Sequence, residues 1–151
     1  MKTRPACFLI LLLFGMNACA GGGLMSVIDY SAPDKAALLE ASRGFDTWLR
    51  GHGFQPCAEP KSVRVAGMLP GIVYEGMTDS WYQGTYHGSA PFFIRLSVVP
   101  APESKIIGYR YLDAPGMSES KYKALERHAE DFVREFTKYT ESLSAKPGPA
   151  K

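Results

Sequence analysis

Phe92-Phe93-Ile94-Arg95-Leu96-Ser97-Val98-Val99, residues 92–99, is the stretch that decides the fold class predicted from this sequence. Every second residue from Phe92 onward is apolar, whereas Arg95 and Ser97 stand at positions between them. Successive side chains of an extended chain point to opposite faces. The alternation therefore predicts a β-strand with one face packed on an apolar core.

The segments on both sides of residues 92–99 show the same period of two. Trp81–His87 precedes it across a Gly- and Pro-containing turn, and Lys105–Leu112 follows it after a loop with two prolines. Ile72–Gly76 and Ser62–Ala66 are further, shorter candidates for strands. The connections are too short for parallel crossovers, so we expect an antiparallel sheet.

A helical period precedes the strands. Ser31, Pro33 and Asp34 are typical of a helix start, and Gly51 and Gly53 are typical of a helix end. One face of the helix predicted between them consists of Leu38, Ser42, Phe45, Trp48 and Leu49. With a single polar member, this face is expected to pack on the sheet.

A longer helix is predicted after the strands, with Ser118 as its N-cap. Its apolar stripe consists of Tyr122, Leu125, Ala129, Phe132, Val133, Phe136, Tyr139 and Leu143. Each helix has one apolar face, so both are expected on the same side of the sheet, the other side being open or closed by dimerisation. The sequence thus predicts an α+β domain: an antiparallel sheet of three to four strands with an N-terminal and a long C-terminal helix packed on one face.

The first residues have the composition of an export signal. Lys2 and Arg4 are basic, and residues 7–16 carry no charge. A helix of this length would be only about 15 Å long, whereas the hydrocarbon core of a bilayer is about 30 Å thick. A basic start followed by a short apolar run predicts a secretory signal rather than a transmembrane helix.

Met16-Asn17-Ala18-Cys19, which ends this segment, resembles the lipobox of bacterial lipoprotein precursors. The resemblance implies that the signal is removed before Cys19, that the Cys19 sulfur receives a diacylglycerol and that the new amino terminus is acylated, for example by palmitate. Ala20 follows the cysteine, which implies the outer membrane, facing the periplasm, if the cell is Gram-negative. Alternatively, Ala18-Cys19-Ala20 fits cleavage after Ala20 and a secreted or soluble periplasmic protein.

These observations predict the domain organisation. Residues 1–18 form the signal peptide, residues 19–30 the lipid anchor and tether, residues 31–144 a single α+β domain and residues 145–151 a disordered tail. For residues 24–30 the sequence leaves two predictions open, a tether or a short strand.

The charges exclude one class of partner. The chain has 17 Lys and Arg against 15 Asp and Glu, and two of the basic residues lie in the signal, so the rest is formally neutral. Because phosphate contacts need a basic surface, nucleic-acid binding is not expected. The membrane, through acylated Cys19, is the partner that the signal predicts.

The residues that could carry chemistry do not form a known motif. His52, His87 and His128 lie too far apart in sequence for a metal-ligand motif, so no metal or cofactor is predicted. Cys57 is the one cysteine left after removal of the signal and lipidation of Cys19. Cys57, His87 and Asp79 could be combined into a nucleophilic site, but no motif supports the combination, and no catalytic residue is assigned.

The aromatic strands are the best lead to function. A ligand or partner surface is predicted from Trp81, Tyr82, Tyr86, His87, Arg95 and Tyr109. Aromatic residues and arginine are enriched at binding hot spots, although aromatic residues also favour strands for packing alone. The leading hypothesis is an envelope binding or assembly module for a protein partner, including self-association. The alternatives are a binding protein for a small apolar or glycan ligand and a hydrolase that uses His87.

Overall fold

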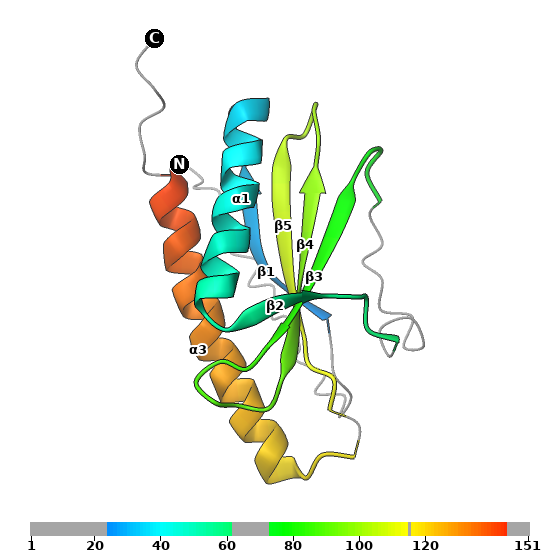
Figure 1. Ribbon diagram of the computed structural model, residues 1–151, viewed down its shortest axis with the longest axis vertical. Coiled ribbons are helices and arrows are strands. Elements are labelled where there is room, and N and C mark those ends of the chain that lie inside the picture. Colours follow the sequence, from blue (N-terminus) through cyan, green and yellow to red (C-terminus); the bar gives the residue numbers. More distant parts are fainter. Residues whose placement is uncertain (1–23, 62–72, 115, 145–151) are drawn as a thin grey trace, which may run out of the picture.

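The computed structural model describes residues 24–61, 73–114 and 116–144 (Figure 1). The strands and helices follow in the order β1 (Leu24–Ser31), α1 (Lys35–Gly51), β2 (Phe54–Cys57), β3 (Thr78–Gly84), β4 (Phe92–Val99), β5 (Lys105–Tyr111) and α3 (Glu119–Ser144). The predicted export signal with Cys19, the predicted strand Ser62–Ala66 and the predicted tail 145–151 lie outside the described residues.

The strands form one antiparallel sheet in the order β1-β5-β4-β3-β2. The predicted α+β class and antiparallel sheet are confirmed, but the sheet has five strands rather than three to four. Figure 1 shows α1 and α3 on the same side of the sheet. Neither helix in the described part of the chain has both the length and the hydropathy needed to cross a bilayer.

The additional strands are the two edges of the sheet. Residues 24–30, assigned to a tether or a short strand, form most of β1 and pair with β5. Gly108 of β5 permits this close pairing, since a Cβ there would lie 2.5 Å from Cγ1 of Ile28. β2 was not predicted because Pro56 interrupts its sequence, but proline is tolerated on an edge strand.

Two strand predictions are wrong: the described residues of Ile72–Gly76 do not form a strand, and Trp81–His87 has different bounds. Residues 73–76 lie outside any strand and end in a turn in which Met77 N–H donates to the Tyr74 carbonyl. β3 begins at Thr78 and ends at Gly84, so Tyr86 and His87 belong to the loop that follows it. Loop residues can show the alternating apolar and polar pattern of a strand. They form a strand only where a neighbouring strand supplies hydrogen-bond partners.

Both predicted helices are present. The N-cap of α1 is Asp34, whose Oδ1 accepts a hydrogen bond of 2.8 Å from Ala37 N–H, because Ser31 is still part of β1. α3 buries Leu125, Ala129, Phe132, Phe136 and Thr140 against the rest of the domain. The remaining apolar members of its predicted stripe are partly buried at the margin of the same core.

Candidate functional site

Three of the predicted surface residues meet on the sheet face opposite the helices. Trp81 of β3, Arg95 of β4 and Tyr109 of β5 are successive cross-strand neighbours, so they form a row across the sheet. The guanidinium carbon of Arg95 lies 5.9 Å from the Trp81 ring centroid and 5.7 Å from the Tyr109 ring centroid. Arginine thus stacks between two aromatic neighbours, a stabilising cation–π arrangement.

Arg95 is only 4% exposed and is held by one carboxylate. Its Nη2 donates to Asp79 at 2.6 Å, and the other oxygen of Asp79 accepts a 2.6 Å hydrogen bond from the Ser97 hydroxyl. Nε and Nη1 of Arg95 have no hydrogen-bond partner in the structure. Since Trp81 is also buried, these two residues do not form an exposed aromatic surface in this conformation.

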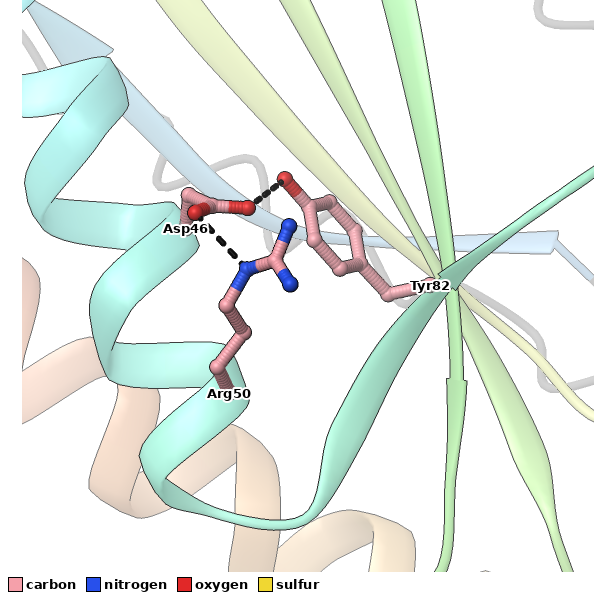
Figure 2. A network of polar contacts seen from close by, with 3 residues as sticks. All are labelled: Asp46, Arg50 and Tyr82. Carbon is pink, nitrogen blue, oxygen red and sulfur yellow. Dashed lines mark hydrogen bonds and ion pairs between the residues drawn. The ribbon is translucent and has the colours of Figure 1, made fainter.

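Tyr82 points to the other side of the sheet, where it joins α1 to β3. Its hydroxyl donates to Oδ1 of Asp46 at 2.8 Å, and Nε of Arg50 donates to Oδ2 at 2.9 Å (Figure 2). Burial alone would raise the pKa of Asp46, but the hydrogen bonds from Arg50 and Tyr82 outweigh it and lower the pKa. Burial and the Asp46 carboxylate together raise the pKa of Tyr82. This network is therefore a helix–sheet contact.

Tyr86 and His87 lie in the β3–β4 loop, apart from the row. Tyr86 is buried against Phe132 of α3, and the Glu135 carboxylate lies beside its hydroxyl. Burial and the nearby Glu135 carboxylate raise its pKa. His87 is exposed, has a positive φ of 51° and lies with its ring 4.0 Å from that of Tyr86. The six predicted residues therefore occupy three different environments.

The two buried tyrosines give a matched test of these contacts. Tyr82→Phe should destabilise the fold by about 1–2 kcal/mol, because a hydrogen bond to a carboxylate is lost. It should also raise the pKa of Asp46, so that the stability this carboxylate contributes is lost at a higher pH as the solution is acidified. Urea unfolding and an NMR titration of the Asp46 carboxylate measure the two effects.

Tyr86→Phe is the control, because its hydroxyl lies beside the Glu135 carboxylate without a well-formed hydrogen bond. We expect a smaller loss of stability than for Tyr82→Phe. A loss for Tyr86→Phe as large as that for Tyr82→Phe would contradict this assignment.

Cys57, His87 and Asp79 do not form a nucleophilic site. Cys57 is the cross-strand neighbour of Trp81, close to Asp79. The Asp79 carboxylate already accepts hydrogen bonds from Arg95 and Ser97. His87 follows the far end of β3, and the strand from Asp79 to Gly84 alone extends about 17 Å. Burial raises the pKa of the Cys57 thiol, which makes it a weaker nucleophile at neutral pH. The arrangement does not support a hydrolase that uses His87.

Two grooves border the sheet at its opposite edges. One, of about 480 Å³, runs along the β2–β3 edge and is lined by Asp46, Arg50, Pro56, Cys57, Glu59, Asp79, Ser80, Trp81 and Tyr82. The other, of about 570 Å³, separates β1 from the C-terminal half of α3. Within the described ranges, no group of His, Cys, Asp and Glu is arranged to hold a metal ion.

The groove beside β1 was missed by sequence reasoning. Its lining comprises Val27, Ile28, Asp29, Thr137, Thr140, Glu141 and Ser144. The available signal was the alternation of Ile28 and Tyr30 with Asp29, which marks residues 24–30 as strand rather than tether. The end of α3 could not be connected with that strand, because the two are separated by almost the whole domain sequence.

Searches of protein-family models, of curated protein sequences and of solved structures with this chain give no match.

Proposed function

We propose that this chain is a membrane-anchored lipoprotein of the bacterial envelope, and that its domain is a binding or assembly module whose protein partner adds a strand to β1. The anchor rests on the sequence Met16-Asn17-Ala18-Cys19. The observation that carries the binding role is the edge position of β1, which is hydrogen-bonded only to β5 in the described part of the sheet.

The two sheet edges differ in their capacity to accept a strand. β2 has four residues and includes Pro56, which lacks a backbone N–H, so it is a poor template. β1 has eight residues and no proline. Exposed edge strands recognise partner segments through main-chain hydrogen bonds, with specificity from the neighbouring side chains. β1 is therefore the better docking edge.

The anchor would also determine where β1 lies. Five residue steps separate Cys19 from Leu24, and a fully extended chain covers at most about 18 Å over that distance. A lipid on Cys19 would therefore hold the start of β1 close to the membrane surface. A partner recognised at this edge would be an envelope protein, or a segment of one, near the same membrane.

A small ligand at the β2–β3 edge is the second candidate function. The groove there combines Trp81 and Tyr82 with the carboxylates of Asp46 and Asp79, which could accept hydrogen bonds from the hydroxyl groups of a glycan. Both carboxylates already bond to side chains of the domain. We therefore favour the protein-binding role.

The experiment uses the full chain produced in a bacterial host with its own signal. Intact mass should show cleavage before Cys19 with added acyl mass. Unmodified cleavage after Ala20, or retention of residues 1–18, would reject the anchor. A photo-crosslinking amino acid at Asp29 should give one discrete protein adduct in the envelope. The same group at Leu39, which is 48% exposed on α1, is the matched control. Equal labelling from both positions would reject the binding role of β1.

A further inference from the structure

The charge of the groove beside β1 restricts what can dock on this edge. The side chains that line it include two carboxylates, Asp29 and Glu141, and no lysine or arginine among the described residues. Lys105 of β5 interacts electrostatically with Asp29 but lies outside the lining. Both acidic side chains are exposed. The last turn of α3 contains no basic residue. The negative end of the α3 helix dipole therefore makes the electrostatic potential of the groove more negative.

The shape of the groove also suits an extended chain. Val27 and Ile28 provide an apolar wall on the strand side, while Thr137, Thr140 and Ser144 provide the wall on the helix side. Side chains of an added strand would alternate, one set pointing into this groove under α3 and the other lying on the opposite face of the sheet, which carries Asp29. A register shift between Ser26 and Ile28 interrupts regular pairing at the start of β1. The usable part of the edge is therefore residues 27–31.

A second copy of this chain is a poor occupant. Pairing of two β1 edges about a two-fold axis would place the same surface against itself. Asp29 and Glu141 of each copy would then lie near the same carboxylates of the other, and like charges at cross-strand positions are destabilising. A partner of opposite charge avoids this repulsion.

We infer that residues 27–31 and the groove beneath α3 bind an extended, basic segment of a partner protein, which adds a strand to the sheet and places lysine or arginine side chains near Asp29 and Glu141. This inference rests on the proposed function, because it specifies the partner that docks on β1. Main-chain pairing would supply the alignment, and the acidic groove would select the charge.

The test uses the full chain in a non-ionic detergent and three fluorescent peptides that match β1 in length. The first has two adjacent central lysines among valines, so that one lysine points to each face of the sheet. The second has glutamates at those two positions, and the third is the lysine peptide with a proline beside the lysines. We expect the lysine peptide alone to bind and to slow amide hydrogen exchange at residues 27–31. Its affinity should fall with ionic strength, since the selecting charges are exposed.

Charge-reversal variants separate a local effect from a general one. Glu141→Lys should weaken binding of the lysine peptide by about tenfold. Glu130→Lys makes the same change at an exposed position of α3 outside the groove lining and should leave the affinity within about twofold. Circular dichroism would confirm that both variants fold.

The outcomes distinguish the inference from the function beneath it. If the glutamate peptide slows exchange at residues 27–31 as strongly as the lysine peptide, the edge binds strands without charge selection, and only the inference is overturned. If the proline peptide binds equally well, or Glu130→Lys weakens binding as much as Glu141→Lys, binding is not strand addition in this groove. If no peptide slows exchange at residues 27–31, both the inference and the docking role of β1 are rejected.

Discussion

Phe132→Ala should lower the free energy of unfolding by about 4 kcal/mol, a large part of the stability of a typical domain. Phe132 of α3 is fully buried. Its ring lies within 5.6 Å, centroid to centroid, of the rings of Trp48, Phe54, Tyr86, Phe92 and Phe136. The contacts come from α1, β2, β4 and the β3–β4 loop, so no single neighbour can move to fill the cavity.

Urea unfolding measures this effect, with the slope of the transition unchanged if the variant remains two-state. Phe93→Ala is the matched control. Phe93 is a strand phenylalanine on the opposite sheet face, half-buried, whose ring packs on Tyr111 at 6.1 Å. We expect it to cost about 1–2 kcal/mol. Similar losses for both variants would show that Phe132 does not join the helices to the sheet.

Asp79→Ala should destabilise the fold by about 3 kcal/mol, because it leaves the guanidinium of Arg95 buried without a counter-charge. The Arg95 side chain is 5% exposed and that of Asp79 is 34% exposed, so the arginine bears most of the desolvation. Two of the Arg95 nitrogen atoms already have no hydrogen-bond partner among the residues that the structure describes. Removal of the Asp79 carboxylate therefore takes away the ion pair of a buried guanidinium.

A second substitution identifies the source of the loss. Arg95→Met in the Asp79→Ala background should recover much of the stability, since the buried charge is then gone. Asp131→Ala breaks an exposed ion pair with Arg134 and should cost less than about 1 kcal/mol. If Asp79→Ala lowers the free energy of unfolding no more than Asp131→Ala does, Asp79 is not needed to compensate the buried charge of Arg95.

The helices were more predictable than the sheet edges. The stripe that includes Leu125 and Phe132 recurs every three or four residues, and such local spacing identifies a helix face directly. β2 has only four residues and contains Pro56, so its sequence resembles a loop. Its pairing with β3 comes from Phe54, which is fully buried opposite Gly84. A Cβ on Gly84 would lie 2.7 Å from the Phe54 ring.

The candidate site was predictable only in its composition. Trp81 and Tyr82 are adjacent in sequence, and a strand necessarily sends adjacent side chains to opposite faces. Trp81 therefore stacks with Arg95, while Tyr82 reaches Asp46 of α1. The sequence contains the alternation but does not show which face the helices cover, and it gave no reason to join the six predicted residues into one surface.

The sequence by itself determined the fold class of this protein, through the strand alternation in residues 92–99 and the long amphipathic helix after Ser118. These features are local, because side-chain direction in a strand or helix follows from backbone geometry over a few residues. Tertiary structure alone decided that β1 pairs with β5 and lies beside the end of α3. That arrangement brings together segments from opposite ends of the domain, and it depends on which apolar faces fit together in the folded chain.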